Sequence, residues 1–284
     1  MFLNFSKHIL QKQVRYLDSV SLVKKQGQWF CLNKEPDYKH KHILSSIENK
    51  FSNTSTVSCS SKRKVLLCNT SQCIIKKNRI TGFGKVIKYY LSSQNKFSLI
   101  HEYCNLTKIS PSKITPKAYA FSISNNFFSI EETLILEYYE KSLTLNIYAS
   151  YGDKNIYNAV SLAFDLFLQS WKDGFTHLDP HLDNILILNG YAKFIDFEGC
   201  KLNTIDKESH FGFLMGRFYE YWYYKYLTEE QYDNLVYSFL SEEKLEINSM
   251  LFDKTYKLFK EGKKTRHFVN RYFFDSTFRK LVLV

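Results

Sequence analysis

The sequence predicts an α+β chain of two lobes, with an antiparallel sheet and one main helix in the first lobe and mostly helices in the second. Short strand patterns separated by turn residues dominate the first half, whereas long aromatic-rich helical patterns dominate the second. The two patterns meet near residues 137–143. We therefore divide the chain into an N-terminal lobe over residues 51–138 and a C-terminal lobe over residues 139–284. Residues 1–50 are an unassigned extension that packs on the N-terminal lobe or belongs to it.

In the first half, several stretches have the β-branched and apolar composition of strands between turn residues. They lie at residues 20–32, 63–77, 117–123 and 132–139. We expect the last two to form an antiparallel pair. Residues 52–62 are rich in Ser and Thr and predict a loop. Apolar residues at helical spacing over residues 84–109 predict one or two helices.

The second half opens with a clear amphipathic helix over residues 155–172. Its buried stripe is predicted to comprise Ala159, Leu162, Ala163, Leu166, Phe167 and Ser170. Gly174 ends this helix, because glycine readily adopts the left-handed conformation of a C-terminal cap. The strand patterns "ILIL" and "AKFI" around the turn "NGY" then predict a hairpin over residues 185–195. Further helices follow.

Composition limits the classes of partner and compartment. The chain has 284 residues, of which 44% are hydrophobic, so it can bury a substantial core. Its net charge of +11 favours an anionic partner, either nucleic acid, a phospholipid surface or a phosphorylated substrate. Nucleic acid ranks below the other two, because no nucleic-acid-binding signature accompanies the scattered basic residues. Oligomeric state leaves no mark on the sequence.

The six cysteines form no C-x-x-C pair and predict free thiols in a reducing compartment. The N-terminus lacks the sustained apolar segment of a signal peptide, and no apolar run approaches 18 residues. These features predict a cytoplasmic protein, with peripheral association at a membrane face as an extension of that prediction.

The most informative stretch is residues 177–198, "HLDPHLDNILILNGYAKFIDFE". The hairpin returns the chain so that Asn184 and Asp196 lie side by side, with Asp179 within reach of the same centre. Carboxylate and amide oxygens in this arrangement suit Mg²⁺. In phosphoryl transfer, one Asp accepts the proton of the attacking hydroxyl, while an Asn and a second Asp hold the metal.

These residues resemble the catalytic loop and metal motif of the protein-kinase-like fold, in the form found in small-molecule kinases. The resemblance implies that Asp179 is the catalytic base and that Asn184 and Asp196 bind Mg²⁺. It leaves two roles open for His181, beside the transferred phosphate or as a brace of the loop. Leu178 stands where phosphorylation-switched kinases carry an Arg, which implies that this form of control is absent.

The same resemblance implies an ATP site upstream. The string "CIIKK" assigns the phosphate-binding lysine to Lys76, with Lys77 as the alternative, and Glu102 as its partner. The end of "LILEYYEKSL" places the hinge that contacts adenine at Glu137–Tyr139. The chain departs from the pattern in one respect, because it has no glycine-rich loop before Lys76. The Ser-rich residues 55–61 are expected to serve instead.

Within this fold, residues 55–225 most resemble the bacterial lipopolysaccharide core kinases, and especially the heptose(II) kinase family. The quoted hairpin and "KESHFG" at residues 207–212 carry this likeness. It implies an ATP- and Mg²⁺-dependent transferase for lipopolysaccharide biosynthesis, acting on a core heptose at the cytoplasmic face of the inner membrane. Other acceptors stay open, namely the Kdo sugar, a small alcohol, or a protein Ser/Thr. A pseudokinase scaffold is the alternative from a different class.

Overall fold

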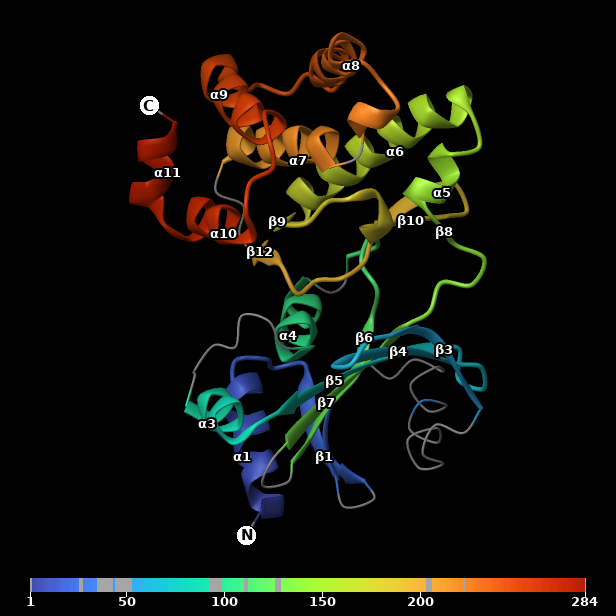
Figure 1. Ribbon diagram of the computed structural model, residues 1–284, viewed down its shortest axis with the longest axis vertical. Coiled ribbons are helices and arrows are strands. Elements are labelled where there is room, and N and C mark those ends of the chain that lie inside the picture. The colour runs from blue at the N-terminus through green and yellow to red at the C-terminus, as the bar shows by residue number, and fades with distance from the viewer. Residues whose placement is uncertain are drawn as a thin grey trace. The chain divides into compact units, whose positions relative to one another are not determined.

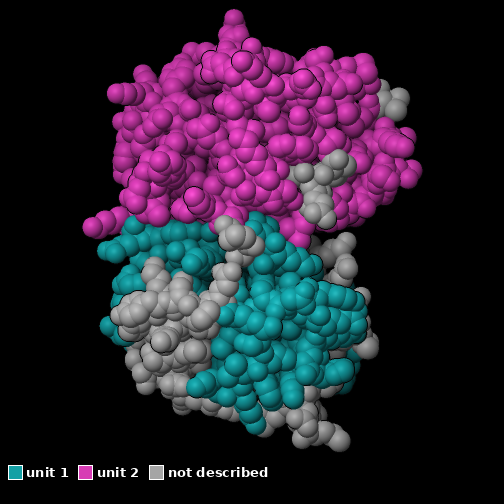
Figure 2. Space-filling model, turned by 180° about the vertical axis from the view of Figure 1, so that it is seen from behind, with its two compact units in different colours: residues 1–111, 115–140 teal, residues 112–114, 141–284 magenta. Residues whose placement is uncertain are grey.

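The computed structural model describes residues 2–25, 28–34, 43, 53–91, 99–109, 112–125, 129–202, 206–221 and 223–283. The chain divides into two compact units (Figure 2). Unit 1 comprises residues 1–111 and 115–140, and unit 2 comprises residues 112–114 and 141–284. Unit 1 contains a large antiparallel sheet and unit 2 is mainly helical (Figure 1), so the predicted α+β class is confirmed.

Unit 1 is built on a seven-stranded sheet with the order β1-β2-β6-β7-β5-β4-β3, and every neighbouring pair is antiparallel. The strands are β1 (Val20–Lys25), β2 (Gln28–Asn33), β3 (Thr54–Cys59), β4 (Arg63–Cys68), β5 (Cys73–Thr81), β6 (Ala118–Asn125) and β7 (Ser129–Glu137). The helices of the unit are α1 (Phe2–Val14), α3 (Phe83–Leu91) and α4 (Leu99–Ile109). The predicted strands, the antiparallel pair β6–β7 and the two helical segments are all present.

The loop predicted over residues 52–62 is wrong for most of its length, because Thr54–Cys59 forms β3. This strand is exposed along its whole length, and among the described residues it pairs with β4 alone, at the edge of the sheet. Its polar residues give no hydrophobic alternation, so the backbone ladder with β4 decides its conformation. The turn is confined to residues 60–62, where the Ser60 amide donates to the carbonyl of Arg63 at 2.7 Å.

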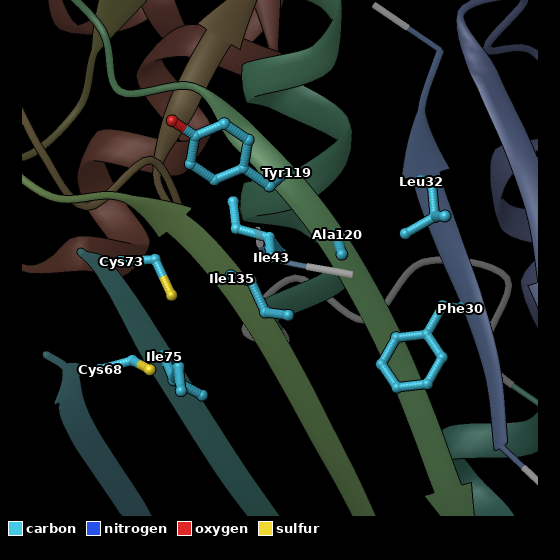
Figure 3. Close-up of a cluster of buried hydrophobic side chains, with 9 residues drawn as sticks. All are labelled: Phe30, Leu32, Ile43, Cys68, Cys73, Ile75, Tyr119, Ala120 and Ile135. Carbon is cyan, nitrogen blue, oxygen red and sulfur yellow. The ribbon is translucent and has the colours of Figure 1, made fainter. Parts of the chain in front are cut away.

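One face of the sheet carries a buried cluster to which strands β2, β4, β5, β6 and β7 all contribute (Figure 3). Its members are Phe30, Leu32, Ile43, Cys68, Cys73, Ile75, Tyr119, Ala120 and Ile135. Helix α4 packs on strands β5, β6 and β7, where its Tyr103 stacks on Phe121 of β6 at 5.8 Å between ring centroids. Because successive side chains of a strand alternate between faces, Ile75 lies in the cluster while Lys76 points the other way.

In unit 2, short strands and one-turn helices connect longer helices. The helices are α5 (Leu145–Ala149), α6 (Asp153–Lys172), α7 (Lys207–Tyr221), α8 (Glu229–Glu242), α9 (Ser249–Lys260), α10 (Arg266–Phe274) and α11 (Ser276–Val282). The strands are β8 (Leu143–Thr144), β9 (Phe175–His177), β10 (Ile185–Leu188), β11 (Tyr191–Phe194) and β12 (Cys200–Leu202). The one-turn helices are η1 (Leu182–Asn184) and η2 (Tyr223–Lys225).

Helix α6 and the hairpin β10–β11 agree with the sequence. The α6 stripe is buried as predicted, except for Leu162, which is half-buried. Gly174 follows the helix with φ of +76°. The hairpin turns at Asn189 and Gly190, both of which have positive φ, as two-residue hairpin turns require. Phe167 of α6 stacks on Phe194 of β11 at 6.1 Å between ring centroids, so this helix supports the hairpin directly.

All six cysteines are free thiols, as predicted. In the part of the chain that the structure describes, no helix combines the length and apolarity needed to cross a lipid bilayer.

Candidate functional site

Unit 1 contains the predicted pair of Lys76 and Glu102. The Lys76 ammonium on β5 lies 2.8 Å and 3.0 Å from the two carboxylate oxygens of Glu102 on α4. The Glu102 side chain has no exposed surface and that of Lys76 is 19% exposed. Burying a carboxylate is costly unless a cation accompanies it, so the Lys76 ammonium offsets the cost of burying Glu102. The predicted pairing is confirmed, whereas its role in ATP binding stays a prediction.

Lys77, the alternative lysine, lies in a different environment. Its ammonium is 3.5 Å from the carboxylate of Glu131, and both side chains are more than one third exposed. Adjacent residues of a strand face opposite sides of the sheet, so only one of the two lysines can reach α4. The structure assigns the pair with Glu102 to Lys76.

Two side chains of the predicted hinge, those of Glu137 and Tyr139, form hydrogen bonds within the protein. Glu137, at the end of β7, accepts a hydrogen bond from the backbone N–H of Lys117 at 3.2 Å, and its own amide donates to the carbonyl of Lys117 at 2.9 Å. Tyr139 is buried, and its hydroxyl donates to the carbonyl of Thr115 at 2.9 Å. A contact of this segment with adenine therefore depends on the backbone of Tyr138 and Tyr139.

In unit 2, His177 at the end of β9 forms hydrogen bonds with the backbone of both aspartates of the candidate site, Asp179 and Asp196. The imidazole is fully buried. Its Nε2 lies 3.0 Å from the carbonyl of Ile195 and 3.1 Å from that of Asp196, and its Nδ1 accepts from the amide of Asp179 at 3.3 Å. These partners fix the tautomer with the proton on Nε2. Burial lowers the pKa of His177, which keeps the ring neutral.

The loop after His177 is closed by its own side chains. Asn184 donates from Nδ2 to the carbonyl of Asp179 at 3.1 Å, which leaves the amide oxygen as the atom that can ligate a metal. His181 caps η1 by accepting from the amide of Asp183 at 3.2 Å. Its Nε2 lies 3.8 Å from the Asp179 carboxylate. Of its two predicted roles, the structure contains the brace, while the contact with a phosphate stays a prediction.

Asp196 follows the hairpin in a left-handed conformation, with φ of +65°. The amide of the preceding Ile195 donates to the carbonyl of Asn184 at 2.9 Å, which brings the two predicted metal ligands to adjacent ladder positions. A non-glycine residue with positive φ costs free energy and is held there by its surroundings. Here the hairpin and the hydrogen bond of His177 hold it. Asp179, Asn184 and Asp196 are therefore brought together by backbone contacts within unit 2.

Sequence reasoning missed two residues of α7 that complete this region. Tyr221 lies with its ring centroid 6.1 Å from that of His181. The Arg217 guanidinium carbon lies 3.8 Å from the centroid of the Tyr221 ring. The Nη2 of the same guanidinium donates to the Tyr221 hydroxyl. Burial raises the pKa of Tyr221 to about 12. The positive charge of Arg217 lowers this pKa, whereas the negative charge of Asp179 raises it. The sequence signal was a single arginine inside the apolar "HFGFLMGRFYEY".

No protein-family model matches the chain, and no curated protein matches it either. The site therefore has to be interpreted from its own geometry.

Proposed function

We propose that the protein is an ATP-dependent kinase with a bilobal protein-kinase-like fold. Its proposed reaction is transfer of a phosphoryl group to a sugar hydroxyl, a heptose of the lipopolysaccharide inner core. The observation that carries the proposal is the gathering of Asp179, Asn184 and Asp196 in unit 2, each positioned by backbone hydrogen bonds. The buried ion pair of Lys76 and Glu102 in unit 1 supports it independently.

The donor atoms of unit 2 suit Mg²⁺. Asn184 presents an amide oxygen because its nitrogen is engaged by the Asp179 carbonyl, and Asp196 adds carboxylate oxygens. Oxygen ligands of this kind, few in number, are what Mg²⁺ takes from proteins when phosphates supply the rest. When bound, the ion neutralises charge on the phosphates of ATP.

The residues of the chain have distinct tasks in this reaction. Lys76, held in place by Glu102, neutralises phosphate charge of ATP. Asp179 is about half exposed and accepts the proton of the acceptor hydroxyl. His177 holds the backbone of Asp179 and Asp196 on either side of the site. The protein thus contributes positioning and electrostatic stabilisation.

Within the kinases, the alternatives are the Kdo sugar, a small alcohol and a protein Ser/Thr. The turn of the β3–β4 hairpin contains no glycine, which favours the pseudokinase scaffold. The intact set of Asp179, Asn184 and Asp196 opposes that alternative, because a scaffold has no use for all three residues.

The test is transfer of labelled phosphate from ATP to dephosphorylated lipopolysaccharide core, with the product mapped by mass spectrometry. Wild type is expected to transfer in the presence of Mg²⁺ only. Asp179→Asn should slow transfer by about 10²- to 10⁴-fold while nucleotide affinity and melting temperature are kept. Asp196→Asn should abolish transfer and weaken Mg²⁺-ATP binding, with the fold retained because Asn tolerates positive φ.

Asp183→Asn is the matched control, since Asp183 lies in the same turn but accepts from the side chain of Asn146 at 3.2 Å. It should transfer at the wild-type rate within a few fold. Nucleotide binding without transfer to any acceptor would leave the scaffold as the function. A loss of less than about tenfold in a stable Asp179→Asn variant would remove Asp179 as the base.

A further inference from the structure

The end of α7 and the loop between α9 and α10 form one fixed basic surface in unit 2. The Arg217 side chain is 3% exposed, and its Nη1 donates to the carbonyl of Lys264 at 3.0 Å. The loop is constrained at both ends, by Gly262 with φ of +87° and by Thr265, which caps α10. Lys263 and Lys264 therefore lie on a short loop whose backbone is hydrogen-bonded to Arg217.

This basic surface adjoins the proposed catalytic base. The Lys263 ammonium lies 6.0 Å from the centroid of the Tyr221 ring, on which Arg217 also stacks. The same ring contacts His181, whose Nε2 lies 3.8 Å from the Asp179 carboxylate. One aromatic ring thus separates the lysine loop from the place where the acceptor hydroxyl would bind.

Positive charge on this surface exceeds the negative charge that faces it. The Glu220 carboxylate lies 3.7 Å from Arg217 and also interacts electrostatically with Lys263 and Lys264. Lys263 is exposed and Lys264 is half-buried. Within the described residues, neither lysine has a carboxylate in ion-pair range, and the Lys264 ammonium donates to the carbonyl of Glu261 at 3.3 Å. The two ammonium groups and the Arg217 guanidinium thus share the single carboxylate of Glu220, and the excess of positive charge suits an anionic ligand.

We propose that Lys263 and Lys264, on the loop held by Arg217, bind an anionic substituent of the acceptor, a phosphate or a carboxylate. The substituent would be carried close to the hydroxyl that Asp179 receives. This inference rests on the proposed kinase function and specifies its substrate class as an acidic acceptor. Ammonium groups bind such anions as charge-assisted donors, and placing them beside the base selects acceptors that are already acidic.

The test compares a Lys263→Gln/Lys264→Gln variant with wild type on acidic core oligosaccharide. We expect KM for this acceptor to rise by about tenfold or more, which corresponds to losing one or two charge-assisted hydrogen bonds. KM for ATP and kcat at saturating acceptor should stay within about twofold, which is less than the loss of one charge-assisted hydrogen bond would cause. The matched control is Lys254→Gln/Lys257→Gln, which removes two exposed lysines from the preceding helix α9. The control should leave both KM values unchanged.

Two further acceptors identify the anion. Core stripped of phosphate but retaining its carboxylates, and core with phosphate but with its carboxylates esterified, are compared with the intact oligosaccharide. The acceptor that lacks the recognised group should show equal KM in wild type and variant. A change in KM for ATP alone would overturn the proposal, because the lysines would then contact the nucleotide. Loss of binding to anionic lipid vesicles with unchanged KM for soluble core would also overturn it.

Calorimetric binding of the acidic oligosaccharide separates this inference from the proposed function. Asp179→Asn protein should bind it, and the same protein with both lysines replaced should bind it about tenfold more weakly. Absence of transfer by wild type would count against the proposed kinase function. The difference in calorimetric affinity tests separately whether Lys263 and Lys264 bind the acceptor. Equal affinities in that pair would overturn the inference even if transfer is observed.

Discussion

Two buried carboxylates of unit 1 and two buried histidines of unit 2 are stabilised in different ways. Unit 1 buries carboxyl groups with donors around them. Glu102 pairs with Lys76, and Glu132 accepts from the Tyr89 hydroxyl at 2.9 Å and from the Leu99 amide at 3.2 Å. Unit 2 buries neutral imidazoles, His177 and His210, which are hydrogen-bonded to backbone carbonyls. The first arrangement depends on charge and the second on backbone geometry.

This difference indicates how each half of the candidate site is made stable. A buried ion pair is strongly destabilised when one partner is removed, since the other charge is left without compensation. A carboxylate positioned through the backbone, such as Asp196, can lose its charge while the contacts of His177 with that backbone remain. Stability and activity should therefore be coupled at Lys76 and separable at Asp196.

The largest effect on stability is expected at Lys76. Lys76→Met should lower the free energy of unfolding of unit 1 by about 3–5 kcal/mol, because the buried Glu102 carboxylate loses the ammonium group that faces it. Lys77→Met is the matched control and should cost less than about 1 kcal/mol, since its pair with Glu131 is exposed. Urea unfolding measures both. Similar losses for the two variants would mean that burial of the pair does not govern its contribution.

The next effect is a dependence on pH that arises in unit 2. Burial lowers the pKa of His210 from 6.5 to about 4. Its Nε2 donates to the carbonyl of Phe167 at 2.9 Å, and its Nδ1 accepts from the Thr176 hydroxyl at 2.8 Å. Below pH 6.5 the unfolded chain protonates His210 whereas the folded chain does not. The contribution of the neutral His210 to stability is therefore complete above pH 6.5. It is lost as the pH falls towards 4, by about 3 kcal/mol.

Urea unfolding at a series of pH values should show this slope in wild type and a smaller slope in His210→Gln. His267→Gln removes an exposed histidine of α10 and should leave the slope unchanged. An unchanged slope in His210→Gln would assign the acid sensitivity to other groups, of which His177 is the first to examine, because burial lowers its pKa as well.

The smallest effects contrast the packing of helices in the two units. A Cβ on Gly216 of α7 would lie 2.5 Å from the carbonyl oxygen of Tyr256 on α9, whereas nothing lies within 4 Å of a Cβ on Gly84 of α3. Gly216→Ala should cost about 1–3 kcal/mol through this clash. Gly84→Ala should stabilise the protein by up to about 1 kcal/mol through helix propensity. Melting temperatures of the two variants should therefore move in opposite directions, and a shift in the same direction would contradict the packing difference.

Local sequence patterns were sufficient where the signal and the structure lie in one segment. The hairpin turn at Asn189 and Gly190 needs two residues that tolerate positive φ, and the α6 stripe follows helical spacing. The order of Asp179, Asn184 and Asp196 along one hairpin could also be predicted, because the turn fixes the return of the chain. The link from Lys76 to Glu102 required a family pattern, since 26 residues separate them.

The sequence by itself determined the α+β class, the position of most strands and helices, and the order of Asp179, Asn184 and Asp196 along the chain. Only the tertiary structure decided that residues 54–59 form an edge strand, that His177 joins both aspartates, and that Arg217 and the loop at Lys264 flank the site. The physical reason is the distance along the chain over which each interaction acts. Turn chemistry and periodicity act within about one or two turns of chain, whereas an edge ladder, a buried imidazole and a guanidinium on a distant carbonyl depend on partners that only the folded chain brings together.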